Sequence, residues 1–141
     1  MADPTRGLLD TNILIQRSRL QHEDFPDEAA ISAITLAELA AGPHLVMGDD
    51  PDAVRERARR VEVLQRAEAE FDPIAFDAEA ARLFGRLRAA VRASGRTPRR
   101  RVADLMIASV AAAHGLALYT ANPDDFAGLD DVVSVHAVRF R

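Results

Sequence analysis

The fold is decided by residues 7–15, which read Gly-Leu-Leu-Asp-Thr-Asn-Ile-Leu-Ile: an apolar run stops at three small polar residues and then resumes. The first part suits a short strand covered on both faces, and Thr11 or Asn12 suits the start of a helix. Asp10 then falls at the carboxyl end of a strand, where open parallel α/β sheets bind ligands. Asp10 is therefore a candidate metal ligand or acid/base group, the alternative being a residue that only forms an Asx turn or a helix cap.

The same order of strand followed by helix recurs along the chain. Residues 29–34 and 116–120 predict further buried strands, and residues 132–138 a final edge strand. Short helices are expected at 35–41, before a Gly-Pro stop, and at 102–113, before Gly115. This pattern predicts one α/β domain over 1–141, a three-layer α/β/α sandwich with a mainly parallel central sheet.

Two long amphipathic helices are predicted between these elements, and they form a helical arm at about 52–93. In the first, an apolar stripe is expected on one side, and charged residues that include Arg59 and Arg60 are expected to face solvent. The stripe comprises Val54, Ala58, Val61, Leu64 and Ala67. The arm has two alternative uses, core packing and dimerisation or contact with a partner.

Composition excludes several classes of protein. The 141 residues contain no cysteine and no lysine, which removes disulfides, Cys-ligated zinc, a P-loop lysine and a Schiff-base lysine. No apolar run approaches the roughly 20 residues of a membrane span, and the N-terminus lacks a signal-peptide core. A cytoplasmic protein with no membrane association is the expectation. The net charge of −4 does not by itself indicate nucleic-acid binding.

Two further carboxylates are expected near Asp10. Glu38 follows the second predicted strand within about one helical turn, although Thr35-x-x-Glu38 also fits a capping box. Asp104 is the lone carboxylate near the start of an apolar helix, where it either binds a partner or only stabilises the helix dipole.

The strand at 116–120 also ends in polar residues. Asn122 and Asp125 follow it, and Asn122 suits a helix cap before Pro123. Carboxylates gathered at one edge of the sheet repel one another unless a cation binds between them. An oxygen-only ligand set predicts Mg²⁺, or Mn²⁺, rather than Zn²⁺.

A cluster of arginines lies in the loop at 94–101. Guanidinium groups bind phosphate oxygens, so the cluster is a candidate contact for RNA, the alternative being a simply solvated charge run. Its members are Arg96, Arg99, Arg100 and Arg101.

Four motifs in order resemble the PIN-domain nucleases, and the small size resembles VapC, the toxin of type II VapBC toxin–antitoxin systems. The motifs are Leu-Asp-Thr-Asn at 9–12, Thr-x-x-Glu-Leu at 35–39, Asp-x-x-Ile-Ala at 104–108, and Thr-x-Asn-x-x-Asp-Phe at 120–126. The resemblance covers nearly the whole chain. It implies a Mg²⁺-dependent endoribonuclease that cuts structured RNA to leave a 5′-phosphate and a 3′-hydroxyl. It also implies inhibition by a VapB antitoxin and assembly as a homodimer.

Site residues follow from the same resemblance. The resemblance implies that Asp10, Glu38 and Asp104 are catalytic and bind the metal. It also implies a set of small polar residues that orient them: Thr11, Asn12, Thr120 and Asn122. The fourth acidic position falls at Asn122, so either Asn122 or Asp125 serves there, and the number of metal ions stays open.

Two other functions remain as alternatives. The first is a non-catalytic PIN-like module that binds RNA or protein, since Asn122 stands at an acidic position. The second is a HAD-like phosphohydrolase with Asp10 as nucleophile, which is disfavoured because Asn12 replaces that family's second aspartate and no lysine is present.

Overall fold

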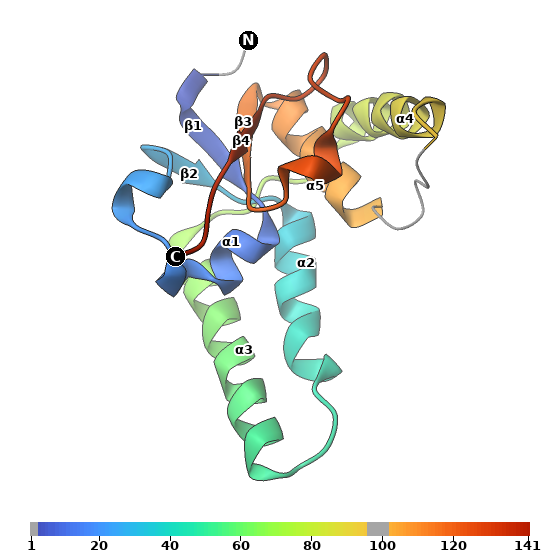
Figure 1. The fold of residues 1–141 in the computed structure, drawn as a ribbon. Coiled ribbons are helices and arrows are strands. Elements are labelled where there is room, and N and C mark those ends of the chain that lie inside the picture. The colour runs from blue at the N-terminus through green and yellow to red at the C-terminus, as the bar shows by residue number, and fades with distance from the viewer. Residues whose placement is uncertain (1–2, 96–101) are drawn as a thin grey trace.

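The computed structural model describes residues 3–95 and 102–141, and in it four parallel strands form a central sheet (Figure 1). Along the sheet the order is β2-β1-β3-β4, with β1 at Asp3–Leu9, β2 at Glu28–Ala30, β3 at Leu116–Thr120 and β4 at Val135–Ala137. β1 and β3 are the central strands, and β3 is buried at every residue. The predicted parallel sheet is confirmed, including its final edge strand. The buried strand predicted at 29–34 is wrong in its extent and burial: β2 lies at an edge of the sheet, ends at Ala30 and has its first two residues exposed, and a helix begins at Ala33.

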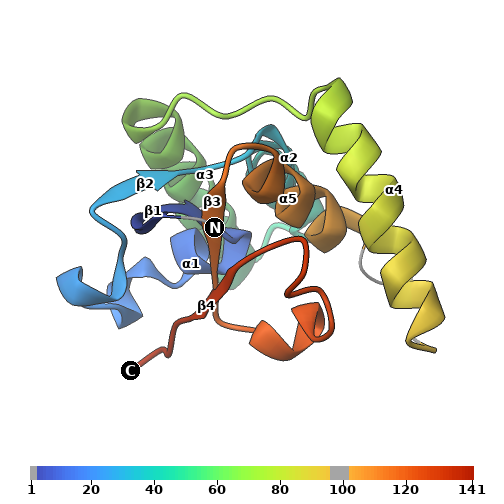
Figure 2. The same ribbon diagram turned by 90° about the horizontal axis from the view of Figure 1, so that it is seen from above.

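Helices cover both faces of the sheet, which confirms the three-layer α/β/α architecture. α4 (Ala78–Ala93) and α5 (Val102–Ala113) pack together on one side (Figure 2). Leu8 and Leu118 point into the core on that side, together with Leu87 of α4 and Leu105 of α5. Burial of these apolar side chains supplies most of the driving force that holds the layers together.

The opposite face carries a second core. Leu9 and Tyr119 of the sheet pack there with Ile13 of α1 (Thr11–Ile15), Leu39 of α2 (Ala33–Ala41) and Ala67 of α3 (Pro51–Glu70). Neighbouring strand residues therefore enter opposite cores, as the alternation of side chains along a strand requires. The end of β1 at residues 7–9 is buried on both faces, as residues 7–15 predicted, and so is β3.

α2 and α3 project beyond the sheet as a helical hairpin, joined through the 3₁₀ helix η3 (Gly42–Leu45). α3 packs mainly on α2 and η3, whereas α4 packs mainly on α5. The two long helices of the region 52–93 therefore belong to different layers and do not pack as one arm.

The predicted apolar stripe of α3 is confirmed at its C-terminal end, where Leu64 and Ala67 pack in the second core, and is wrong in the first half of the helix. Ala53 and Ala67 are the buried residues of the helix, while Val54 is 52% exposed and Ala58 is also exposed. Arg60 is half-buried on the packed side. The main neighbours of α3 are α2 and η3, and the first half of the helix does not reach the core. Apolar residues spaced three and four apart therefore do not all become buried there.

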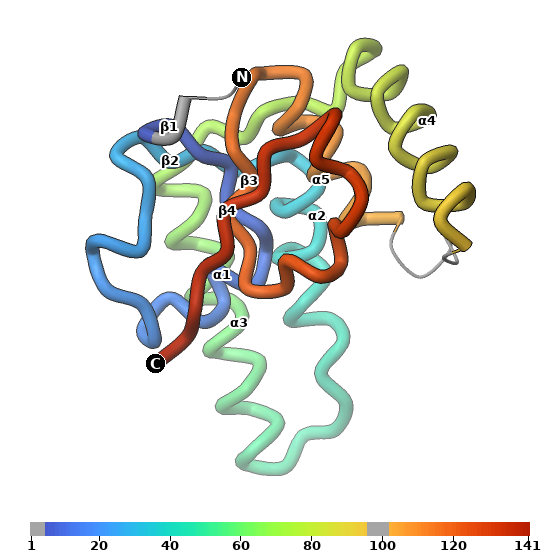
Figure 3. Tube along the Cα trace, turned by 45° about the horizontal axis from the view of Figure 1, so that its top comes forward, coloured from blue at the N-terminus to red at the C-terminus, as the bar shows by residue number. Residues whose placement is uncertain are grey.

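The remaining segments are short. The 3₁₀ helices η1 (Arg17–Arg19) and η2 (His22–Asp24) follow α1, and η5 (Pro123–Phe126) follows β3. The C-terminal residue returns to the first two of these, because the Arg141 N–H donates to the Arg19 carbonyl at 2.9 Å (Figure 3). Within residues 3–95 and 102–141, no helix is both long enough and apolar enough to cross a membrane.

Candidate active site

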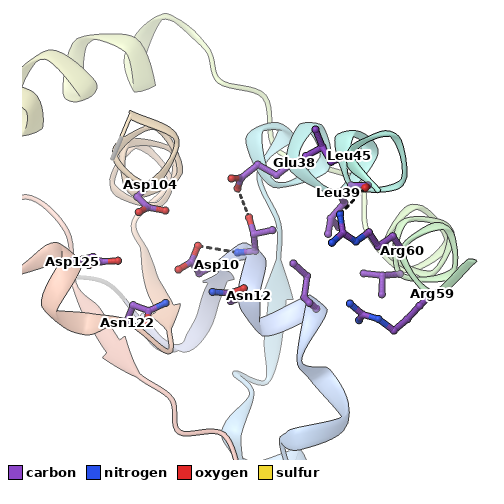
Figure 4. Close-up of a pocket in the computed structure, with 14 residues that line it drawn as sticks. Asp10, Asn12, Glu38, Leu39, Leu45, Arg59, Arg60, Asp104, Asn122 and Asp125 are labelled. Carbon is purple, nitrogen blue, oxygen red and sulfur yellow. Dashed lines mark hydrogen bonds between the residues drawn. The ribbon is translucent and has the colours of Figure 1, made fainter. Parts of the chain in front are cut away.

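A cavity of about 440 Å³ opens at the carboxyl ends of β1 and β3. Its acidic end is drawn in Figure 4 and is lined by Asp10, Glu38, Asp104, Asn122 and Asp125. These residues come from four separate parts of the chain and meet because parallel strands end at the same edge of a sheet. The structure thus places the predicted acidic residues in the lining of one cavity.

Asp10 is the centre of this acidic end. It is only 6% exposed, and its Oδ1 accepts a hydrogen bond from the Thr11 N–H at 2.9 Å. Its Oδ2 accepts a second bond from Thr120 Oγ1 at 2.8 Å. Asp10 is also the N-cap of α1, so Thr11 and Asn12 are not the capping residues. Asp10 therefore both caps α1 and lines the cavity, so the two alternatives for this residue hold together.

Burial raises the pKa of Asp10 above its ordinary value. The hydrogen bonds from Thr120 and Thr11 oppose that rise, because they favour the charged carboxylate, while the negative charges of Glu38 and Asp125 add to it. The balance leaves a carboxylate whose charge is costly when no cation is near. A bound cation removes this cost, so the cavity is electrostatically suited to one.

Glu38 reaches the cavity by a different route from the predicted one. α2 begins one turn earlier than expected, with Ser32 as its N-cap, and the Ser32 Oγ accepts from the Thr35 N–H at 3.1 Å. Thr35 therefore caps nothing, and the predicted capping box is wrong. Glu38 lies in the second turn, and its Oε1 accepts a 2.6 Å hydrogen bond from Thr11 Oγ1.

A chain of hydroxyls supports that contact. Thr11 Oγ1 lies 3.1 Å from Thr35 Oγ1, and Thr35 is completely buried. The residue after β1 is thereby tied to α2 at the position from which Glu38 projects. This arrangement fixes the Glu38 carboxylate relative to Asp10.

Asp104 and the segment after β3 complete the acidic end. Asp104 lies in the first turn of α5 and is only partly buried, because it faces the cavity rather than the core. Asn122 is the N-cap residue of η5, as predicted, but in the described part of the chain its side chain makes no capping hydrogen bond to that helix. Its backbone N–H instead donates to Thr120 Oγ1 at 3.0 Å. Thr120 thus connects Asn122 to Asp10.

Arg59 and Arg60 also line the cavity, at the end opposite the carboxylates (Figure 4). The sequence placed both on a solvated face, since their spacing from Glu56 resembles ordinary surface ion pairs. The Arg60 Nη1 donates to the Gly42 carbonyl at 2.8 Å, which turns this side chain toward η3. Their position depends on the crossing of α3 over α2, and no local pattern in the sequence reports that crossing.

The donor set fits a hard divalent cation such as Mg²⁺ or Mn²⁺, because carboxylates and one amide line the acidic end with no thiol or imidazole. Across residues 3–95 and 102–141, no three His, Cys, Asp or Glu side chains adopt a closed metal-binding arrangement.

The arginines predicted to contact RNA are not placed by the structure. Arg96, Arg99, Arg100 and Arg101 lie outside the described residues, so their role stays a prediction.

The fold and the acid-lined cavity define a class of protein. The chain belongs to the PIN domain family, whose model matches residues 7–132. The family resemblance drawn from the four motifs is therefore confirmed.

Known relatives narrow the class further. The chain is 37% identical to Ribonuclease VapC5 of Mycobacterium tuberculosis over 139 residues, which covers 96% of each protein. It is 30% identical to Ribonuclease VapC4 of the same organism over 131 residues, covering 90% of this chain and 93% of VapC4. Among solved structures it is similar to VapBC-5 of M. tuberculosis, a member of the VapBC family of toxin–antitoxin systems. That match has a TM-score of 0.76 and 38% identity over 96% of this chain and 99% of the other.

Proposed function

We propose that this protein is the toxin of a type II toxin–antitoxin pair, an endoribonuclease that requires Mg²⁺ or Mn²⁺ and is neutralised by a VapB-type antitoxin. Its substrates are structured RNAs such as tRNA, rRNA or mRNA. Similarity to two ribonucleases over nearly the full chain supports the activity. The observation that carries the proposal is the cavity in which Asp10, Glu38 and Asp104 meet.

The acidic residues have distinct parts in this proposal. Asp10, Glu38 and Asp104 hold the divalent ion, with Asp125 or Asn122 as the fourth contributor. When bound, such an ion supplies Lewis acidity toward a phosphodiester oxygen and toward water. Thr120 keeps Asp10 ionised and oriented through the 2.8 Å hydrogen bond to Oδ2. Thr11 orients Glu38 through the 2.6 Å hydrogen bond to Oε1, and Asn12 lines the cavity beside them.

Neutralisation by the antitoxin follows from the charge of the same cavity. A basic side chain of the antitoxin enters the acidic end and takes the place of the cation, which explains inhibition by competition of charges. The similarity to a solved VapBC toxin–antitoxin structure supports a partner of this kind. We place the pair in the cytoplasm, where RNA substrates are available, and expect the toxin to be a homodimer.

The direct test uses antitoxin-free protein incubated with tRNA and ribosomal RNA, with 5′-end mapping of the products. Cleavage is expected with Mg²⁺ and is expected to stop in EDTA and in the Asp10→Asn variant. Asp49→Asn removes a carboxylate from an exposed loop outside the cavity and is the matched control. Equal cutting by the Asp10→Asn and Asp49→Asn proteins would contradict the proposal.

One observation favours a second function. The cavity places the amide of Asn122 where a fourth carboxylate is expected, which fits a PIN-like module that binds RNA or protein without turnover. Such a module retains RNA in the same assay and yields no new 5′ ends with Mg²⁺ or Mn²⁺.

A further inference from the structure

A second, smaller cavity of about 210 Å³ adjoins the active-site cavity along α1 and α3. The two are continuous in their lining, because Ile15, Arg59 and Val63 contribute to both. The first cavity ends in carboxylates at the sheet edge, and the second leads away from them along the helices. Together they form a path across the surface, which we call the α1–α3 path.

Arginines mark the α1–α3 path beyond the acidic end. Arg59 stands at the junction of the two cavities, and Arg17 and Arg66 line the second one. One carboxylate, Glu62, lines the second cavity beside the arginines, so the charge along the path changes from negative at Asp10 to predominantly positive. Arg59 and Arg66 are exposed and Arg17 is half-buried, so all three can be reached from solvent.

Each of two glutamates holds a pair of these arginines in place. Glu56 accepts from Arg59 at 2.6 and 3.0 Å and from Arg60 at 3.1 Å. These bonds hold the pKa of Glu56 down at about 2, so it stays ionised at any physiological pH. Glu70 likewise accepts from Arg17 at 2.8 Å and from Arg66 at 3.0 Å.

This pairing positions the guanidinium groups without neutralising them. Two guanidiniums face one carboxylate in each group, which leaves one positive charge in surplus. A guanidinium has five N–H donors, and Glu56 takes up the Nε and one Nη2 donor of Arg59. The remaining donors can bind a phosphate, and little side-chain entropy is lost because Glu56 already restrains the group.

We propose that Arg59 binds a phosphate of the RNA strand next to the cleaved bond, and that Arg66 and Arg17 guide the strand along the α1–α3 path. This inference rests on the proposed ribonuclease function and assigns the substrate side of the same site. Repulsion from the carboxylates keeps the flanking phosphates away from the acidic end, and the arginines provide the nearest complementary charge. Ile15, Leu39 and Val63 line the wall between them and offer an apolar surface to a nucleobase.

The experiment measures binding separately from cleavage. Asp10→Asn protein in EDTA is titrated with a fluorescein-labelled single-stranded oligoribonucleotide at several salt concentrations. Adding Arg59→Ala is expected to weaken binding roughly fivefold, as for one partly exposed ionic contact. The slope of log K against log salt is expected to fall by about 0.7, as for one phosphate contact on a single strand. Arg59→Lys is expected to restore most of that slope.

Arg55→Ala is the matched control. Arg55 lies on the same helix and pairs with Asp52 one turn earlier, but it lines neither cavity. The Arg55→Ala substitution removes the same charge and is expected to leave the RNA affinity and the slope of log K against log salt unchanged. Thermal unfolding of each variant verifies that the fold is retained.

Three results would overturn the inference. One is equal weakening by Arg55→Ala and Arg59→Ala, since only the overall charge then matters. Another is unchanged RNA binding by the Arg59→Ala protein. The third is unchanged RNA binding together with a weakened antitoxin complex, which would make the path a protein-docking surface.

Cleavage by the otherwise unmodified protein with Mg²⁺ is measured in parallel. If the protein cleaves RNA and Arg59→Ala does not change the rate, the role of Arg59 is wrong while the ribonuclease function stands. If neither the unmodified protein nor the Arg59→Ala variant cleaves RNA, the proposed ribonuclease function itself is wrong.

Discussion

Thr120 and Asp10 are 110 residues apart in the chain, and a 2.8 Å hydrogen bond from Thr120 Oγ1 to Asp10 Oδ2 joins them across the central strands. Both residues are buried; Thr120 ends β3 and Asp10 directly follows β1, at the edge of the sheet that forms the cavity. The bond opposes the rise in the pKa of Asp10 that burial causes. A single neutral hydroxyl therefore helps to determine how readily the acidic end of the cavity becomes charged.

Replacing Thr120 with valine is expected to impair cleavage mainly on the acidic side of the pH profile. The variant keeps the side-chain shape but loses the donor, so the pKa of Asp10 rises further and a proton competes better with the cation. Loss of one charged hydrogen bond predicts about a tenfold lower kcat/KM at mildly acidic pH. Recovery is expected as the pH rises. Thr120→Ser keeps the hydroxyl and is expected to retain the original profile, and identical profiles for both variants would contradict the argument.

Asp10→Asn is expected to stabilise the metal-free protein at neutral pH while it abolishes cleavage. The pKa of Asp10 is raised above 3.8 in the folded state, so the folded protein binds this proton more tightly than the unfolded chain does. The free energy of unfolding of the metal-free protein therefore falls as the pH rises from near 3.8 through the raised pKa of Asp10. The Asp10→Asn variant has no titrating group at this position, so it does not lose this stability. Thermal unfolding in EDTA should show a higher Tm for the variant at neutral pH and no gain at pH values below both pKa values.

Addition of Mg²⁺ is expected to reverse that order. A ligand that binds only the folded state adds about 2.7 kcal/mol at 100 times its Kd. The Tm of the unmodified protein should rise with Mg²⁺, whereas that of the Asp10→Asn protein should respond little. An equal Mg²⁺ response in both proteins would place the cation somewhere else.

Asp125→Asn distinguishes the two candidates for the fourth metal-site position. Asp125 lines the cavity and raises the pKa of Asp10 by its charge. If Asp125 contributes to the metal site, its neutralisation should weaken Mg²⁺ binding by about tenfold. The same change should lower the pKa of Asp10, so the acid limb of the pH profile should move to lower pH.

Asp124→Asn is the control for that experiment, because Asp124 is the adjacent carboxylate and lies outside the cavity lining. Calorimetric titration with Mg²⁺ checks the affinities. Loss of affinity in an Asn122→Ala protein, with Asp125→Asn silent, would assign the position to Asn122 instead.

Gly7→Ala is expected to destabilise the central sheet. A Cβ at this position of β1 would lie 2.5 Å from the Cδ1 and Cε1 atoms of Tyr119. The Tyr119 ring cannot shift freely, because it stacks on His136 with centroids 4.3 Å apart. Overpacking of this kind costs about 1–3 kcal/mol.

Gly85→Ala in α4 is the control. No atom lies within 4 Å of a Cβ built at this position, and replacing glycine with alanine stabilises a helix by up to about 1 kcal/mol. Urea unfolding of the two variants should give shifts of opposite sign.

Much of the fold and of the acidic end could be predicted from the chain alone. The abrupt change from Leu9 to Asp10, and from the strand at 116–120 to Asn122, identified strand ends without any tertiary information. These signals are local: a buried strand requires apolar residues, and a polar residue at its end must find a partner or a ligand. Parallel strands then bring their carboxyl ends to one edge, so the meeting of Asp10 with Asn122 followed from topology.

The errors share one cause. The N-cap at Ser32 instead of Thr35, and the outward position of Val54, depend on where α2 and α3 begin to contact their neighbours. A capping box and an apolar stripe are each compatible with more than one helix register. Packing of α2 and α3 against each other and against η3 selected the register that the sequence left open.

The sequence by itself determined the order of strands and helices, the parallel sheet and the carboxylates that gather at its edge, because each follows from short-range patterns and the chirality of strand–helix–strand connections. Only the tertiary structure decided that Thr11 joins Glu38 and that Arg59 lies at the far end of the same cavity. The first relationship depends on how α1 packs against α2, and the second on how α3 packs against α2; both arise from the packing of whole helix surfaces rather than from any contiguous stretch of residues.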